Sequence, residues 1–315
     1  MRAKLGVYIP MYGGWVRSPL LEEEVTYSNA EKTAILAEAT GIHSVWVPDH
    51  LINNIKGENF PSLEAWTTLS GIAAVTRKIE LFNTCICQGF RYPTVLAKMC
   101  ATIQDLSKGR FSLSIGAGNN RRDFEPSGLS WEDHDSRIDK SREQIEIIKK
   151  LWKEPIVNYS GKYYSIKDGM LEPKPSPAIP VWWAGNSEKS MELTADQGDG
   201  WLMSSSTKEA VTEKIRNMEE RLEKRGRKSI KYAVPGHLII EKTDEMAEER
   251  LRRLLPKNRS AVELLKATGY VGSPETVASK ILEKDETGLS YIIFQCAPTI
   301  STLNIFKENV LPLLQ

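Results

Sequence analysis

Asp49 and His50 are well placed for acid–base chemistry, because they directly follow a short apolar run at 44–47 and Pro48. A histidine changes its charge near neutral pH, and a neighbouring carboxylate favours its protonated form. The alternative interpretation is a solvated pair in a loop. We predict His50 as a catalytic residue because it directly follows a strand-like run.

His237 is a second histidine in an apolar context, between Gly236 and the apolar run at 238–240. This position suits a buried structural histidine at least as well as a catalytic one. His237 is therefore a candidate catalytic residue with a structural alternative.

Small residues follow two other apolar runs. Gly116 and Gly118 come directly after the run at 111–115, and the segment Gly185-Asn186-Ser187 comes directly after the run at 181–184. A turn of small residues before a helix can bind a phosphate through its backbone N–H groups. An ordinary helix N-cap formed by Ser187 would explain the second segment without any ligand.

The elements around these residues decide whether they can meet. Strands are predicted at 5–9, 44–47, 79–85, 111–115, 181–184, 200–203, 232–234 running on to 237–240, and 291–294, and helices at 29–40, 64–76, 95–106, 134–152, 208–225 and 274–284. This alternation predicts a (β/α)8 TIM barrel with insertions at its C-terminal face, as a single domain over residues 1–315. A doubly wound sheet is the alternative, although no G-x-G-x-x-G motif follows the first strand.

Composition narrows the class of protein. The 315 residues are 41% hydrophobic and 26% charged, and 42 Lys and Arg balance 41 Asp and Glu to a net charge of +1. Disordered and fibrous classes are excluded, and no overall field would attract nucleic acid or an anionic membrane. Without a signal-like or membrane-spanning run we expect a cytoplasmic protein. The four cysteines are expected to be buried, reduced thiols, and no metal site is expected.

The segment from Phe90 to Gly118, with Ser107-Lys-Gly-Arg110 leading into a strand and a glycine turn, resembles the bacterial-luciferase-like superfamily of flavin- and deazaflavin-dependent oxidoreductases. Supporting likeness lies at 45–50, 159–164, 173–175, 183–187 and 271–277. The resemblance implies a (β/α)8 barrel, a flavin-type cofactor at its C-terminal face, and a homodimer or homotetramer.

The resemblance also implies roles for individual residues. Asp49 and His50 would lie beside the flavin ring, with a non-proline cis peptide between Thr84 and Cys85 behind it. The other implied cofactor contacts are Ser114, Gly116, Gly118 and Asp123 near the cofactor, and Gly185, Asn186 and Ser187 at its phosphate. His237 would face the substrate, and Trp15 is a weaker substrate candidate.

Different segments resemble different subgroups. The segments at 7–15 and 184–187 look like pyrimidine monooxygenase, the stretch 226–245 looks like alkanesulfonate monooxygenase, and 47–51 looks like deazaflavin-dependent enzymes. Asn119 stands where several deazaflavin enzymes have a Glu, and Pro235 stands where the alkanesulfonate enzymes have an Arg.

The resemblance therefore implies a two-component monooxygenase that takes reduced FMN from a separate flavin reductase and oxidises a small organic substrate with O2. One alternative is a hydride-transfer enzyme that uses the deazaflavin coenzyme F420, whose acidic tail Arg121 and Arg122 would bind. A second alternative is a non-catalytic barrel.

The segment 155–180, or a loop after His237, would act as a lid.

Overall fold

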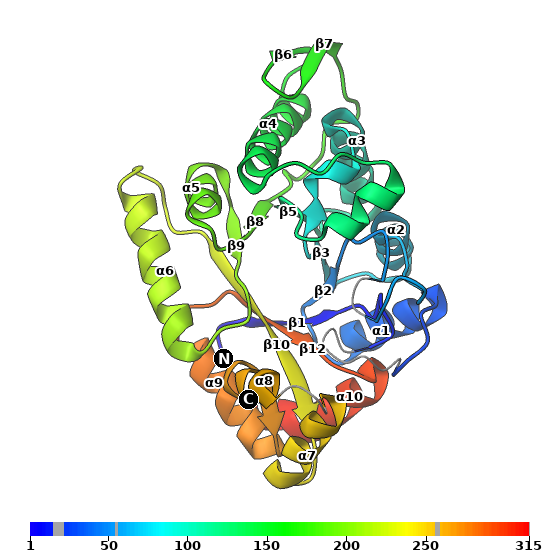
Figure 1. Ribbon diagram of the computed structural model, residues 1–315, viewed down its shortest axis with the longest axis vertical. Coiled ribbons are helices and arrows are strands. Elements are labelled where there is room, and N and C mark those ends of the chain that lie inside the picture. Colours follow the sequence, from blue (N-terminus) through cyan, green and yellow to red (C-terminus); the bar gives the residue numbers. More distant parts are fainter. Residues whose placement is uncertain (15–21, 54–55, 256–258, 315) are drawn as a thin grey trace.

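The centre of the molecule is a closed barrel of parallel strands (Figure 1), seen in a computed structural model that describes residues 1–14, 22–53, 56–255 and 259–314. The barrel strands, in order, are β1 (Lys4–Tyr8), β2 (Ser44–Val47), β3 (Glu80–Asn83), β5 (Phe111–Gly116), β8 (Val181–Ala184), β9 (Gly200–Leu202), β10 (Lys231–Ile240) and β12 (Tyr291–Gln295). The ring closes because β10 pairs with both β9 and β12, and β12 pairs with β1. The predicted (β/α)8 barrel is confirmed, and the doubly wound sheet is excluded.

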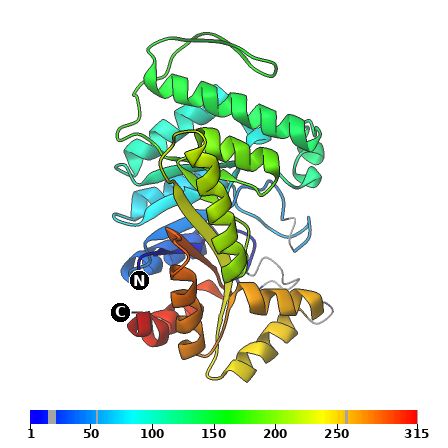
Figure 2. The ribbon, with the colours of Figure 1, turned by 90° about the vertical axis from the view of Figure 1, so that its left-hand side faces the viewer.

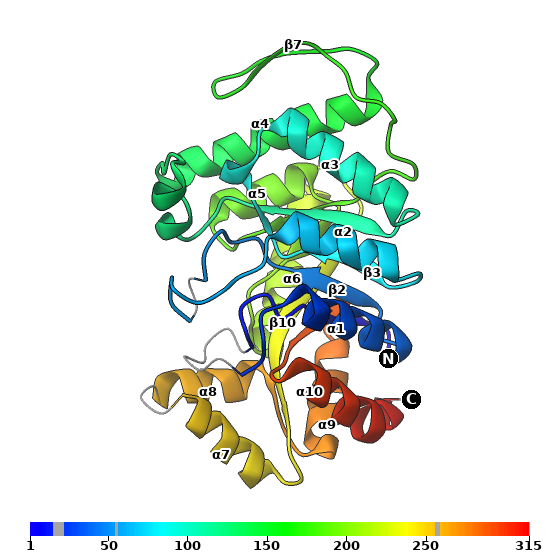
Figure 3. The ribbon, with the colours of Figure 1, turned by 90° about the vertical axis from the view of Figure 1, so that its right-hand side faces the viewer.

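Helices surround the barrel, and Figure 3 shows α1 to α4 following one another around one side. They are α1 (Tyr27–Ala39), α2 (Ala65–Val75), α3 (Pro93–Leu106), α4 (His134–Lys153), α5 (Glu188–Gln197), α6 (Lys208–Glu223), α9 (Pro274–Asp285) and α10 (Thr299–Ile305). Short helical turns are η1 (Gln88–Phe90), η2 (Arg121–Asp123), η3 (Glu125–Ser127), η4 (Phe306–Val310) and η5 (Leu311–Leu314).

An insertion follows β10 and comprises α7 (Asp244–Leu254), α8 (Arg259–Thr268) and β11 (Tyr270–Gly272). β11 pairs in parallel with the last residues of β10, from Leu238 to Ile240. The insertion therefore extends the barrel beyond the C-terminal end of that strand. A further short strand, β4 (Ile86–Cys87), pairs with β5 at the same end of the barrel.

Aromatic side chains fill the inside of the barrel. The rings of Trp46 and Phe82 stack with centroids 3.9 Å apart, and Trp182 and Tyr291 pack against them edge to face. Gly200 provides the room for Trp182, because a Cβ at this position would lie 2.2 Å from a ring atom. A barrel filled in this way has no central channel, so a ligand must bind at one end.

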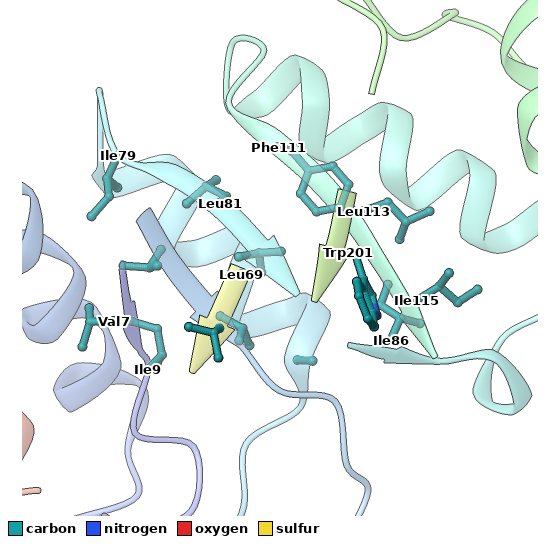
Figure 4. Close-up of a cluster of buried hydrophobic side chains, with 14 of the residues drawn as sticks. Val7, Ile9, Leu69, Ile79, Leu81, Ile86, Phe111, Leu113, Ile115 and Trp201 are labelled. Atoms are coloured by element: carbon teal, nitrogen blue, oxygen red, sulfur yellow. The ribbon is translucent and has the colours of Figure 1, made fainter. Parts of the chain in front are cut away.

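The outward-facing residues of the strands form the second core layer. Figure 4 shows Leu81, Leu113 and Ile115 in this layer, together with Leu69 of α2. Successive strand residues point to opposite faces, which turns Ser112 and Ser114 of β5 inward while Leu113 and Ile115 pack against the helices.

Arg110 links the ends of two helices to the start of a strand through its hydrogen bonds. Its guanidinium donates to the carbonyl oxygens of Ala73, Thr76, Ile79 and Ser107, and to the hydroxyl of Thr76. These acceptors belong to the C-terminal ends of α2 and α3 and to the approach to β3. The arginine of the Ser-Lys-Gly-Arg segment is therefore a structural residue in this fold.

The segment 155–180 contains an antiparallel hairpin of β6 (Val157–Ser160) and β7 (Ser165–Gly169). The carboxylate of Glu143 on α4 accepts hydrogen bonds from three backbone N–H groups, those of Lys162, Tyr163 and Tyr164. Figures 1 and 2 show this hairpin and α7 at opposite ends of the molecule. The hairpin therefore lies along the outside of α4.

The cysteines are all free thiols, as predicted; Cys87, Cys100 and Cys296 are buried and Cys85 is half-buried. Burial raises the pKa of the Cys85 thiol to about 12, which keeps it protonated at neutral pH. Within the described ranges, no helix combines the length and apolar character that crossing a membrane requires.

Candidate functional site

A pocket of about 260 Å³ lies at the C-terminal ends of β2, β3, β5 and β8. Most of the predicted site residues line it: Asp49, His50, Thr84, Cys85, Gly116, Gly118, Asp123, Gly185, Asn186 and Ser187. The barrel therefore brings together residues that are far apart in the sequence, at the end where ligands bind in this architecture.

Two predicted residues do not line this pocket. Ser114 is buried within β5, and His237 is buried within β10, in register with Gln295 of β12. The strand β10 continues through His237 to Ile240, as predicted, so the loop after His237 begins beyond Ile240. No lining residue comes from 155–180. Trp15 lies outside the described residues.

His50 and Asp123 form a direct pair at the mouth of the pocket. His50 Nδ1 lies 2.7 Å from Asp123 Oδ2, and Asp123 Oδ1 accepts from the backbone N–H groups of Leu51 and Ile52. Burial alone would raise the pKa of the Asp123 carboxyl, but the hydrogen bonds from His50 and these amides lower it. Asp123 therefore stays ionised and fixes the orientation of the imidazole.

Asp49 lines the pocket, but its carboxylate is turned toward Arg91. Asp49 Oδ2 lies 2.6 Å from Arg91 Nη1, and Oδ1 lies 3.1 Å from Nη2. Burial raises the pKa of the Asp49 carboxyl, and the guanidinium of Arg91 opposes that shift. The expectation that this carboxylate meets the cofactor is not supported by its hydrogen bonds.

The pocket floor consists of two segments that fit closely together. The peptide between Thr84 and Cys85 is cis, as the resemblance implied. A Cβ at Gly116 would lie 2.5 Å from Cys85 Sγ, and a Cβ at Gly118, whose φ is +80°, would lie 2.7 Å from Cys87 Sγ. The two thiols occupy the space that side chains at these glycines would need, so this part of the pocket is tightly packed.

Another part of the pocket lining provides hydrogen-bond donors. Ser187 caps the N-terminus of α5, with its Oγ 3.3 Å from the backbone N of Ser190 and 3.0 Å from Ser190 Oγ. His134, the first residue of α4, lies with Nε2 3.3 Å from Ser187 Oγ. Two helix N-termini and two hydroxyl groups therefore meet here, which is a donor set that fits a phosphate.

The sequence did not mark His134, which lines the pocket, or Arg137, which holds a turn beside it. His134 looked like part of an exposed acidic turn, and it is exposed, yet it lies beside Ser187 because the starts of α4 and α5 are adjacent. Arg137, one turn further along α4, donates to the carbonyl oxygen of Ala117 and stacks 3.7 Å over Trp131. It thereby fixes the glycine turn after β5, and no local sequence signal marks this contact.

Aromatic rings close one side of the pocket. Phe90 and Phe124 both line it, with ring centroids 5.2 Å apart, and Trp131 packs on Phe124 from behind at 4.9 Å. The pocket therefore has an apolar wall that reduces the access of water to a bound ring system.

The charged residues around the mouth are largely neutralised. Arg121 pairs with Glu125, and Arg122 pairs with Glu58. Lys189 pairs with Asp139 at 2.8 Å, near the start of α5. Arg121 and Arg122 are exposed, so their suggested contact with an acidic cofactor tail stays a prediction. Among the described residues, no group of three or more His, Cys, Asp or Glu side chains could hold a metal ion.

The fold and the pocket define a (β/α)8 barrel with a pocket at the C-terminal ends of its strands, lined in part by hydroxyl and helix N-terminal donors. The chain belongs to the luciferase-like monooxygenase family, whose model matches residues 12–291. The family resemblance seen in the sequence is thereby confirmed.

The similar proteins include both a monooxygenase and F420-dependent enzymes. The chain is 29% identical over 292 residues to the pyrimidine monooxygenase RutA of Allorhizobium ampelinum, covering 88% of this chain and 77% of that protein. It is 25% identical over 315 residues to an F420-dependent glucose-6-phosphate dehydrogenase of Amycolatopsis mediterranei, covering 90% and 93%. The solved structure of an F420-dependent secondary alcohol dehydrogenase in complex with an F420-acetone adduct superposes over the full length of both chains, with a TM-score of 0.83 at 22% identity.

Proposed function

We propose that this protein is a monooxygenase that uses reduced FMN and O2 to oxidise a small organic substrate, with a separate flavin reductase as its partner and a homodimer or homotetramer as its assembly. The observation that carries the proposal is the pocket itself, in which hydroxyl and helix N-terminal donors that suit one phosphate line the same cavity as Thr84, Cys85 and Gly116. Its family and the likeness to a pyrimidine monooxygenase support the choice of chemistry.

The residues fit FMN in two separate places. Ser187, Ser190 and His134, with the backbone N–H groups at the start of α5, would hold the phosphate. Thr84, Cys85 and Gly116 would lie against the ring system. When bound, the reduced flavin supplies the electrons that activate O2, so one oxygen atom can pass to the substrate.

His50 is the proposed proton-handling residue. Asp123 accepts the Nδ1–H of the imidazole, so proton exchange with a ligand would use Nε2. Phe90 and Phe124 would exclude water from the reacting ligand. His237 stays a candidate for substrate contact from β10.

Hydride transfer with coenzyme F420 is the second candidate function. It is favoured by the His50–Asp123 pair, which suits acid–base work at a carbonyl or hydroxyl group, and by the likeness to F420-dependent enzymes. Against it, the cations considered for the acidic tail of that coenzyme already pair with Glu125 and Glu58.

The test is a reaction with isotopically labelled O2. Reduced FMN is supplied by a flavin reductase, and a panel of small heterocycles, beginning with pyrimidines, is offered as substrates. Incorporation of one labelled oxygen atom into a product, dependent on this protein, supports the proposal. Turnover with F420 and no incorporation would establish the second candidate. Failure to bind any flavin or deazaflavin would support the non-catalytic alternative.

A further inference from the structure

Arg91 makes a two-pronged contact with the carboxylate of Asp49. The two bonds measure 2.6 Å and 3.1 Å, and Asp49 Oδ2 also accepts from the backbone N–H of Cys87 at 3.2 Å. The Asp49 carboxylate is almost completely buried, so its hydrogen bonds depend on these partners. One carboxylate thus joins the end of β2 to β4 and to the segment that follows η1.

The same guanidinium continues outward to α2. Arg91 Nη2 lies 2.7 Å from Glu64 Oε1, and Glu64 caps α2 by accepting from the backbone N–H groups of Trp66 and Thr67. The guanidinium carbon also lies 5.7 Å from the centre of the Trp66 ring. Arg91 is therefore anchored at one end to a helix N-terminus and at the other to the pocket.

The contacts of Arg91 with Asp49 and Glu64, called the Arg91 clamp below, hold a segment that forms one wall of the pocket. Cys85, Cys87 and Phe90 all line the pocket and lie between Thr84 and Arg91 in the chain. On the far side, Gln144 of α4 donates to the carbonyl oxygens of Gln88 and Arg91. Two sets of contacts therefore hold this wall. Gln144 holds it from α4, and Arg91 links it to Asp49 at the end of β2 and to Glu64 at the start of α2.

We propose that Arg91 is a positioning residue that, through Asp49, fixes the wall formed by Cys85, Cys87 and Phe90 at the spacing that a flavin ring needs. This inference rests on the proposed function for the identity of the ligand, but the position of the wall can be measured without any ligand. An arginine is required because one planar guanidinium contacts both oxygens of Asp49 and also Glu64, which a single ammonium group cannot do.

The test compares Arg91→Lys with a matched control, Arg110→Lys. Both arginines make several hydrogen bonds in partly buried surroundings, but every acceptor of Arg110 lies in the outer layer and none lines the pocket. Anaerobic titration with reduced FMN and thermal unfolding are measured for both variants. We expect Arg91→Lys to weaken reduced FMN binding about tenfold, and Arg110→Lys to lower thermal stability without changing binding.

A second readout follows the wall directly. Cys87 is 5% exposed, so its labelling by a thiol reagent reports local opening. We expect Arg91→Lys to speed labelling of Cys87 about tenfold while Cys100 and Cys296 are labelled at the wild-type rate. Equal acceleration at all buried cysteines would mean general destabilisation and would overturn the proposal, as would wild-type labelling of Cys87.

Reduced FMN binding and the labelling of Cys87 together distinguish a failure of the positioning role of Arg91 from a failure of the proposed function. If the wild-type protein does not bind reduced FMN, the proposed function fails, and the labelling of Cys87 still decides whether Arg91 holds the wall. If the wild type binds reduced FMN and Arg91→Lys binds it equally well, the positioning role is wrong while the proposed function stands. Asp49→Asn, which keeps the shape but weakens the clamp, is expected to reproduce both effects of Arg91→Lys.

Discussion

The Nδ1 atom of His50 lies 2.7 Å from Oδ2 of Asp123, a residue 73 positions further along the chain. His50 lies in the loop after β2 and Asp123 is the last residue of η2, and the Asp123 carboxylate also accepts from the backbone of Leu51 and Ile52. The orientation of His50 is thus set by a fixed anion rather than by solvent. If His50 handles protons, its geometry depends on Asp123.

Replacing the two members of this pair should have unequal, non-additive effects. His50→Ala is expected to lower kcat by about a hundredfold or more, the usual contribution of a positioned acid or base. Asp123→Asn keeps a side-chain acceptor for the two amides and should lower kcat about tenfold. The double variant should be no slower than His50→Ala alone. Multiplicative losses would show that the two residues act independently.

The donors at the start of α5 should recognise the phosphate and nothing else of the cofactor. Ser187→Ala and His134→Ala should each weaken reduced FMN about tenfold, because each removes one hydrogen bond to a charged group. Binding of reduced riboflavin, which lacks the phosphate, should stay at the wild-type level. Equal losses for both flavins would place the phosphate elsewhere.

Loss of a helix cap is the confounding effect in that experiment. Ser187 caps α5, and its removal is expected to cost about 1 kcal/mol of stability. Thr207 caps α6 with the same geometry, and it does not line the pocket. Thr207→Ala is therefore the control, and it should lower stability to a similar extent without weakening reduced FMN.

The acidic surroundings of the phosphate end should discriminate against coenzyme F420. Asp133 and Asp135 flank His134 and are exposed, while Glu188, which follows Ser187, pairs with Arg221. A tail of several negative charges would be repelled there, in a salt-dependent way. We expect the deazaflavin riboside, which has no tail, to bind more tightly than the complete coenzyme, and Asp135→Lys to narrow that difference. A wild type that prefers the complete coenzyme would contradict this reasoning.

A pH effect should come from Lys284, which is buried and donates to the carbonyl oxygen of Ser206. Burial lowers the pKa of Lys284 to about 8 from an ordinary value of 10.5. Between these values the unfolded state binds more protons than the folded state, so this group should make stability rise with pH across that window. Lys284→Met should remove that rise in the free energy of unfolding. An unchanged pH profile would contradict the assignment.

Most of the barrel could be predicted because each element carries its own signal. The strands at 44–47, 111–115 and 181–184 are short apolar runs that end in turn residues, and they form within one residue of the predicted limits. The sequence did not identify α7 and α8 as an insertion. Helices of an insertion show the same 3.6-residue periodicity of apolar residues as the helices that surround the barrel.

The site was predictable where it depends on strand ends and was missed where it depends on contacts between helices. His50, Gly116 and Ser187 were found because each directly follows a strand. His134 was missed because only the packing of α4 on α5 places it at the pocket. Asp49 was also predicted from its place after a strand, and it lines the pocket, but the sequence cannot show that Arg91 pairs with its carboxylate.

The most direct test of the central claim is an anaerobic titration of the purified protein with reduced FMN and, separately, with reduced coenzyme F420, each repeated with Ser187→Ala. We expect reduced FMN to bind more tightly than F420, Ser187→Ala to weaken reduced FMN binding, and the wild-type complex to consume O2 when air is admitted. Tight binding of F420, unaffected by oxygen and with no affinity for reduced FMN, would contradict this expectation.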